Sequence, residues 1–302
     1  GLKLFKKGSL RIDNFSCISS REVSGKLFLI KTPPKPIFFP LIYLILFIIT
    51  KSTKIDAFFF VVLLLIYIYI ILISMIANIE TIENVTIITL DDGKANVFSP
   101  TMISEFNSLL DQVPTNKGSL LIHGREGMFS AGFDLKVMMS GAEPAVNMVR
   151  SGFKMLQRVF SFPRPVVASC TGHAIALGAF LLCSSDYRIG VKGDYKIGAN
   201  ELRNNMIVPT PILEIAKFKL TKSHKQRALL NAEMYAIEDA IEPGYLDEIV
   251  DADKIYDIAL EKAKDLATLA HPQYNETKML DQEDVIKKIS NGIEQIKDVV
   301  AR

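Results

Sequence analysis

Beyond the N-terminal quarter of the chain, short apolar runs alternate with amphipathic stretches. The runs at residues 84–90, 119–123 and 165–170 consist largely of apolar, often β-branched residues and predict buried strands. The stretches at 99–113 and 143–162 carry apolar residues on one face at helical spacing and predict helices. Strands that alternate with helices along a chain predict an α/β fold.

Local signals mark where the two helices begin or end. Ser99 is a good N-cap residue, and Pro100 suits the first position of a helix. We therefore expect the first helix to begin at Pro100. The second is expected to end before Pro163, because proline cannot continue a helix.

The last third of the chain is mostly helical in pattern. Residues 238–250, "EDAIEPGYLDEIV", predict a helix that stops at Gly244 and is followed by a strand. The charged and amphipathic residues 253–302 predict a helix that is broken near Pro272. Before this region, "DYRIG" and "DYKIG" predict two short strands.

The N-terminal segment has a different composition. Residues 57–77 carry no charge over about the twenty residues that are needed to cross a bilayer, which predicts a transmembrane helix. A shorter apolar run, 37–50, contains Pro40. If both runs span the membrane they form a two-pass anchor, whereas a single span places the rest of the chain on the far side.

A second interpretation treats residues 1–74 as sequence upstream of the natural start. The chain begins with Gly1, and Met75 directly precedes the part whose sequence pattern is typical of a soluble domain. With both interpretations open, we divide the chain into a hydrophobic segment at 1–77, a core at 78–210 and a helical region at 211–302.

Charge and cysteine content narrow the classes of function. The net charge is +2 with both signs mixed, so a nucleic-acid partner is not expected. The three cysteines are far apart and the four histidines are scattered, so we expect no metal site. The cysteines are expected to be reduced thiols.

Two glycine-containing turns each follow a predicted buried strand. In "MFSAGFDL", residues 128–135, the small residues Ser130, Ala131 and Gly132 let the backbone approach a ligand closely. "GHAIALGAFLLC", residues 172–183, leads into an apolar helix, and the free N–H groups at a helix N-terminus can hold an anion. Two such turns could direct two backbone N–H groups at one oxygen atom.

These turns carry a resemblance to a known family. In their order and spacing, "FSAGFDL", "PRPVVASCTGHAIALGAFLLCSSDYRIG" and "YKIGANEL" resemble the crotonase superfamily of enoyl-CoA hydratases and isomerases. The resemblance covers roughly residues 78–250. It implies a spiral of ββα units, a helical C-terminal region that makes trimer or hexamer contacts, and an acyl-CoA thioester as ligand. Coenzyme A is then part of the substrate, and no separate cofactor is implied.

The resemblance also implies roles for individual residues. The backbone N–H groups of Phe133 and Leu177 would form an oxyanion hole for the thioester oxygen, and Glu201 would be the catalytic carboxylate. Asp134 would shape its turn, and Lys94 would contact a phosphate of coenzyme A. The other residues expected at the substrate are Ser130, Ala131, Gly132, Gly178, Phe180 and Asn200.

The chain departs from the hydratase pattern at two positions. Phe180 stands where hydratases have a first catalytic glutamate, and Leu177 stands where they usually have glycine. Phenylalanine cannot hold water or accept a proton, so efficient hydration requires another acid, such as Glu126 or Glu143, to fold inward. The sequence around Glu201 resembles the Asn-Glu form of the motif in Δ3,Δ2-enoyl-CoA isomerases, which work with a single glutamate.

One acid is enough to move a double bond. It removes the C2 proton, the oxyanion hole holds the dienolate, and the same acid returns the proton at C4. An apolar pocket around Glu201 would raise its pKa toward neutrality. Asn200 either orients this carboxylate or, as we favour, caps the helix that follows. His173 is expected to satisfy a backbone group and Asn96 to shape its loop.

We therefore favour an enoyl-CoA isomerase of fatty-acid oxidation over two alternatives. One is another crotonase-type reaction, including hydration or a lyase step, and the other is a non-catalytic acyl-CoA-binding scaffold. A scaffold has no need of a carboxylate in a dry pocket. Acyl-CoA occurs inside cells, so we expect the cytoplasm or the mitochondrion, with membrane attachment only if residues 1–77 form an anchor.

Overall fold

The computed structural model describes residues 76–297. The predicted span at 57–77 lies outside these residues except for its last two. No helix within residues 76–297 is long and apolar enough to cross a membrane. Ala77 begins a strand instead, where it is buried with 1% of its surface exposed.

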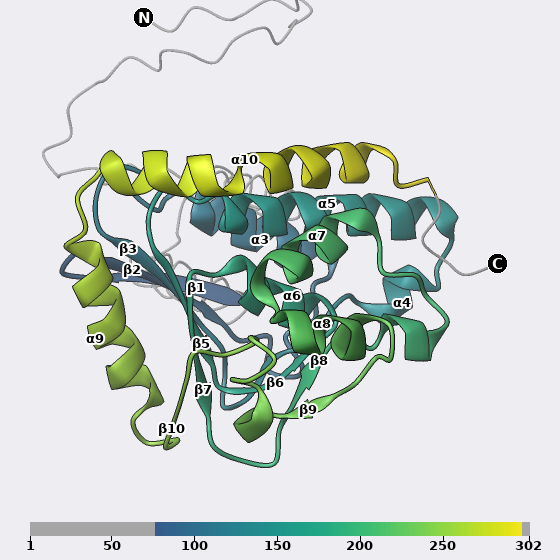
Figure 1. Ribbon diagram of the computed structural model, residues 1–302, viewed down its shortest axis with the longest axis horizontal. Helices are drawn as coiled ribbons and strands as arrows, with labels where there is room; N and C mark the ends of the chain where they lie inside the picture. Colours follow the sequence, from purple (N-terminus) through teal and green to yellow (C-terminus); the bar gives the residue numbers. More distant parts are fainter. Residues whose placement is uncertain (1–75, 298–302) are drawn as a thin grey trace, which may run out of the picture. The chain divides into compact units, whose positions relative to one another are not determined.

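A six-stranded sheet forms the centre of the described part (Figure 1). The strand order is β1-β2-β3-β5-β7-β10, and only the β1–β2 pair is antiparallel. The predicted strands at 84–90, 119–123 and 165–170 are confirmed as β2, β3 and β5. The six strands are β1 (Ala77–Ile82), β2 (Val85–Leu90), β3 (Ser119–His123), β5 (Val166–Cys170), β7 (Tyr187–Val191) and β10 (Glu248–Val250).

A second sheet of four short strands follows the order β4-β6-β8-β9. These strands are β4 (Gly127–Ser130), β6 (Gly172–Ile175), β8 (Lys196–Gly198) and β9 (Tyr235–Ala236). Each of β3, β5 and β7 is followed by a strand of this second sheet and then by a helical segment. This repeated order of two strands and a helical segment agrees with the expected ββα units, although turns were predicted at the positions of β4 and β6.

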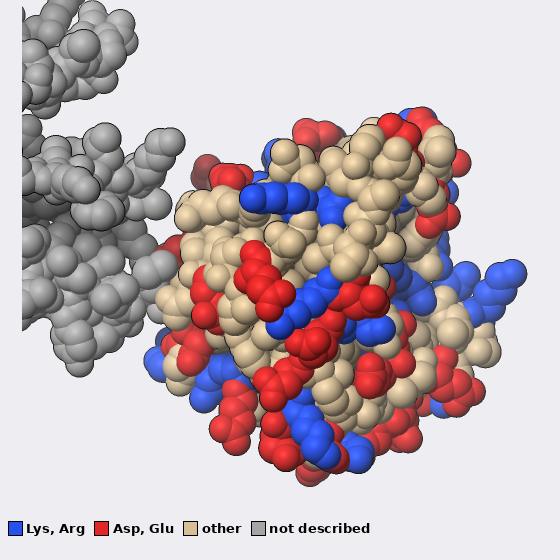
Figure 2. All heavy atoms as spheres, turned by 90° about the vertical axis from the view of Figure 1, so that its left-hand side faces the viewer, with Lys and Arg blue, Asp and Glu red and all other residues tan. Residues whose placement is uncertain are grey.

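Helices pack around the two sheets, with α10 running along α5 and α9 alongside the larger sheet (Figure 1). The helices are α3 (Pro100–Leu110), α4 (Leu135–Met138), α5 (Ala142–Phe160), α6 (Leu177–Ser184), α7 (Thr210–Lys219), α8 (Lys222–Leu229), α9 (Ile255–Ala267) and α10 (Gln273–Glu294). The predicted start at Pro100 is confirmed, because Ser99 Oγ accepts a hydrogen bond from Met102 N at 3.1 Å. Figure 2 shows basic and acidic side chains interspersed on the face where α9 lies.

The prediction of a helix within residues 238–250 is wrong. Only the 3₁₀ turn Ile237–Asp239 forms there, before the predicted strand, which is confirmed as β10. Gly244 adopts φ +91, and the N–H groups of Tyr245 and Leu246 both donate to Ala240 O. This loop buries residues that do not share one helical face, so packing against the core overrides helix propensity.

A buried ion pair attaches α10 to the larger sheet. Lys278 Nζ lies 2.7 Å from Asp186 Oδ2, and the two side chains are 5% and 18% exposed. The same carboxylate oxygen accepts hydrogen bonds from Tyr274 OH and Val166 N. Burial lowers the pKa of Lys278, an effect that the neighbouring carboxylate opposes.

Lys278→Ala is expected to lower the free energy of unfolding by about 3 kcal/mol, because it leaves the Asp186 carboxylate buried without its cation. Urea unfolding checks this value. Lys287→Ala on the same helix is the control, since its exposed pair with Glu283 contributes at most about 0.5 kcal/mol. Equal losses in the two variants would show that the buried pair does not hold α10 in place.

Candidate active site

The two glycine-containing turns meet at the ends of β4 and β6. Gly132 adopts φ +93, and a β-carbon built on it would lie 2.9 Å from Ala176 Cβ and 3.3 Å from Leu177 N. A β-carbon on Gly178 would lie 2.4 Å from Ser130 O. Glycine at these two positions therefore allows the turns to touch.

The backbone N–H groups of Phe133 and Leu177 are both free for a ligand. Leu177 is the first residue of α6, so its N–H has no partner within the helix. Neither group donates to an acceptor among the described residues. Ala176, just before α6, has φ 51, an uncommon conformation for a residue with a side chain. Two N–H groups without acceptors are what the oxyanion hole expected from the sequence requires, and that role stays a prediction.

A cavity of about 110 Å³ opens beside these two groups. Its walls come from both turns, from α4 and α5, and from the segment between β8 and α7 together with the start of α7. The lining residues are Ala131, Phe133, Leu135, Met138, Val149, Phe153, Ala176, Leu177, Asn200, Glu201, Asn204, Met206, Ile207, Pro209 and Ile212. Most of these side chains are apolar, so the cavity suits an apolar ligand with a polar group near Glu201.

Glu201 is the only ionisable side chain among the described residues that line this cavity. It begins a 3₁₀ turn, Glu201–Asn204, and is 7% exposed. Its Oε2 atom is buried and has no hydrogen-bond partner among residues 76–297. Burial raises the pKa of Glu201 to about 7, because desolvation disfavours the charged form. A carboxylic acid with this pKa can both accept and return a proton near neutral pH.

The polar residues of the first turn hold its shape. Ser130 Oγ donates to Asn96 O and accepts from Gly132 N, so it is engaged within the protein. Asn96 adopts φ 48 and its side-chain amide bonds three backbone carbonyls, which confirms its expected role in loop geometry. Asp134 caps α4 through Lys136 N, as expected for a residue that shapes the turn.

The remaining predicted site residues lie in different surroundings. Asn200 lines the cavity and its side chain makes no capping hydrogen bond, so the favoured capping role is wrong. His173 Nδ1 accepts a hydrogen bond from Lys196 N, as predicted. Phe180 is fully buried in α6, and the exposed Lys94 is not among the cavity-lining residues. Their proposed contacts with substrate stay predictions.

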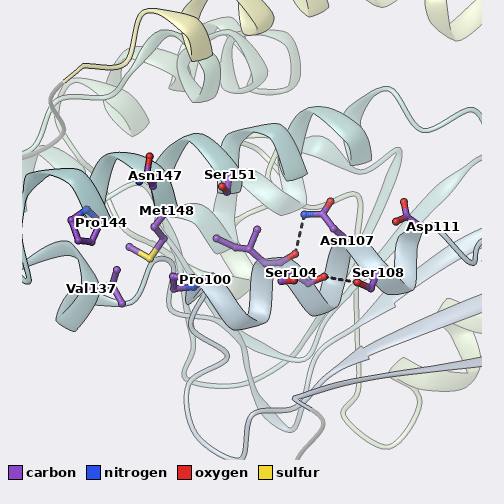
Figure 3. A pocket seen from close by; sticks show the side chains of 11 residues that line it. Pro100, Ser104, Asn107, Ser108, Asp111, Val137, Pro144, Asn147, Met148 and Ser151 are labelled. Atoms are coloured by element: carbon purple, nitrogen blue, oxygen red, sulfur yellow. Dashed lines mark hydrogen bonds between the residues drawn. The ribbon is translucent and has the colours of Figure 1, made fainter. Parts of the chain in front are cut away.

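A larger hollow of about 480 Å³ lies between α3 and α5 (Figure 3). Its polar side chains are serines, asparagines and Asp111, which pairs with Arg158. Asn107 and Ser108 bond backbone carbonyls of their own helix, as the dashed lines in Figure 3 show. This hollow therefore lacks the buried, unpaired acid that distinguishes the smaller cavity.

The walls that α5 and the segment after Glu201 contribute have no signal in the sequence. Val149 and Phe153 come from α5, Met206 comes from the chain leading into α7, and Ile212 comes from α7 itself. The apolar face of α5 predicted burial, but it carried no sign that part of this face borders a ligand cavity. Within residues 76–297, no group of three His, Cys, Asp or Glu side chains is arranged to hold a metal ion.

Comparisons with known proteins identify relatives of this site and fold. Residues 80–297 match the enoyl-CoA hydratase/isomerase family. A probable enoyl-CoA hydratase of Bacillus subtilis is 35% identical over 127 residues, which cover 41% of this chain and 49% of the relative. The peroxisomal enoyl-CoA delta isomerase 1 of Arabidopsis thaliana is 26% identical over 175 residues, 56% of this chain and 73% of the relative. The chain thus spans about half the length of the Bacillus relative.

Solved structures share the fold over most of their length. An enoyl-CoA hydratase/isomerase family protein from Pseudomonas syringae has a TM-score of 0.72 at 37% identity, with 74% of this chain and 97% of the other covered. An enoyl-CoA isomerase of Mycobacterium tuberculosis has a TM-score of 0.69 at 37% identity, with coverages of 73% and 97%. Hydratases and isomerases thus both occur among the similar proteins.

Proposed function

Because this chain belongs to the enoyl-CoA hydratase/isomerase family, we propose that it moves the double bond of a 3-enoyl-CoA to the 2 position, with Glu201 as its one acid–base group. A single observation carries the proposal. Among the described residues, Glu201 is the only ionisable side chain lining the apolar cavity beside the two free N–H groups. Double-bond migration needs only one such group.

The proposed reaction proceeds in two proton transfers. The Glu201 carboxylate removes a proton from C2 of the substrate, and the electron pair spreads over a dienolate whose charge rests on the thioester oxygen. The N–H groups of Phe133 and Leu177 stabilise that charge. Glu201, now protonated, returns the proton at C4, which leaves the double bond between C2 and C3. No cofactor is needed beyond the coenzyme A of the substrate.

Hydration is the weaker candidate because it needs a second group to hold and activate water. Glu126 and Glu143, the acids considered from the sequence, are both exposed and neither lines the cavity. Phe180 at the position of the first hydratase glutamate is fully buried and apolar. Among the described residues, Glu201 is therefore the one acid in the cavity that could serve hydration, and isomerisation already uses it.

The pH dependence of isomerisation tests the role of Glu201. Glu201 must be ionised to take the C2 proton, and its pKa is about 7. We expect kcat/KM to rise about tenfold per pH unit below this pKa and to level off above it. The absorbance of the conjugated 2-enoyl thioester, formed from 3-enoyl-CoA between pH 5 and 9, measures the profile. A rate that stays flat down to pH 5 would exclude a base with a raised pKa.

A further inference from the structure

We infer that Gly152 on α5 sets the width of the acyl pocket by seating the ring of Phe133, an inference that rests on the proposed acyl-CoA function. Gly152 is a positioning residue, since it acts on the substrate only through Phe133. It lies in the interior of α5, where glycine is a poorer helix former than alanine. Helix stability alone therefore gives no reason for a glycine at this position.

The surroundings of Gly152 supply a reason. A β-carbon built on Gly152 would lie 2.4 Å from Phe133 Cε1 and 2.6 Å from Phe133 Cζ. It would also lie 3.5 Å from Leu177 Cδ2. The side chains of both residues that offer N–H groups to the ligand thus rest against one bare stretch of helix backbone.

The Phe133 ring lies between α5 and the cavity. Its ring centroid lies 5.8 Å from that of Phe153, which is itself buried. Phe133, Phe153 and Leu177 all line the cavity that holds Glu201. An added methyl group at Gly152 would push the ring away from α5, and the empty space adjoining the ring is this cavity. The pocket would narrow at the oxyanion hole.

The apolar lining indicates which part of the substrate would be affected. Beyond Phe133, the cavity lining includes Leu135 and Ile207, which are 63% and 68% exposed. Exposed apolar side chains at a cavity rim are suited to covering an extended hydrocarbon chain. An acyl chain that leaves the thioester site for this rim passes Phe133, so a displaced ring would obstruct long chains more than short ones.

The experiment measures binding of saturated acyl-CoA to the full chain, so it does not depend on turnover. Calorimetric titrations with coenzyme A, butyryl-CoA and dodecanoyl-CoA compare the wild type with Gly152→Ala, Phe133→Leu and the double variant. Ser151→Ala, an exposed neighbour on the same helix, is the control. We expect Gly152→Ala to weaken dodecanoyl-CoA binding by about 10-fold or more, with butyryl-CoA less affected and coenzyme A unchanged.

The double variant separates a clash from a general loss of structure. Leucine lacks the Cε1 and Cζ atoms that an alanine β-carbon would meet, so adding Phe133→Leu should restore dodecanoyl-CoA binding to within about 3-fold of Phe133→Leu alone. If Gly152→Ala does not fold, the double variant should still fold and bind. Wild-type binding in Gly152→Ala, an equal loss for both chain lengths, or no rescue in the double variant would overturn the inference.

The failure of the proposed function would look different. A wild-type protein that binds dodecanoyl-CoA but does not isomerise 3-enoyl-CoA would refute the isomerase proposal and leave the role of Gly152 testable by binding. A wild-type protein that binds no acyl-CoA would overturn both.

Discussion

Glu201→Gln is expected to lower kcat for the conversion of 3-enoyl-CoA to 2-enoyl-CoA by about 10³-fold, since it removes the general base and acid together. Glutamine has nearly the same shape and keeps a polar group in the cavity, so binding of a saturated acyl-CoA should change little. Steady-state kinetics and calorimetric binding check the two statements. Undiminished turnover would show that another group moves the proton.

The stability of the same variant provides a control for folding. The folded-state pKa of Glu201, about 7, is raised above the ordinary value of 4.5. Below pH 4.5 the side chain is neutral in both states. Between pH 4.5 and 7 the unfolded chain ionises while the folded protein keeps its proton, so stability is lost over this range and the loss is complete above pH 7. At pH 8.5 Glu201→Gln should therefore unfold with a free energy up to about 3 kcal/mol higher than the wild type.

At pH 4 this difference in stability should largely disappear, because the glutamate is then protonated in both states. Urea unfolding at the two pH values measures it. An inactive variant that is already unfolded at pH 8.5 without urea would mean that the activity was lost through unfolding and not through loss of the acid.

Gly178→Ala is the second change with a large expected effect. Its β-carbon would lie 2.4 Å from Ser130 O, a backbone atom that cannot turn aside as a side chain would. The two turns would have to separate, which moves the Leu177 N–H relative to that of Phe133. We expect kcat to fall by about 10²-fold or more, as for the loss of one oxyanion-hole donor.

Overpacking at the same contact should also lower the free energy of unfolding by about 1–3 kcal/mol. Ser184→Ala is the control on α6, since its hydroxyl bonds Phe180 O within the same helix and lies away from the turn contact. It should keep wild-type kcat. A fully active Gly178→Ala protein would show that the contact between the turns does not align the two N–H groups.

Local signals in the sequence were sufficient to predict the helices and strands whose positions depend on neighbouring residues. The start of α3 followed from Ser99 and Pro100, and β2, β3 and β5 followed from apolar runs. The strands β4 and β6 were missed because each has only four residues, one of them glycine, and lacks the apolar run that marks β3 and β5. The loop around Gly244 was misassigned as helix because its buried residues pack against several elements.

The same distinction applies to the site. The order of three motifs placed Phe133, Leu177 and Glu201, and the structure brings them to one cavity. The walls from α5 could not be predicted, because an amphipathic pattern shows which face is buried but not which neighbour it meets. Gly152 gave no signal at all, since its importance depends on the position of the Phe133 ring.

The most direct test of the single-glutamate account is to supply one preparation of the full chain with 3-enoyl-CoA and with 2-enoyl-CoA, and to follow the conjugated thioester absorbance in each. Absorbance is expected to rise with 3-enoyl-CoA, and 2-enoyl-CoA is expected to give only the 3-enoyl isomer and no hydrated product. A fall in absorbance with 2-enoyl-CoA that is accompanied by formation of 3-hydroxyacyl-CoA would mean that water is added across the double bond, and would contradict the claim that Glu201 acts alone in double-bond migration.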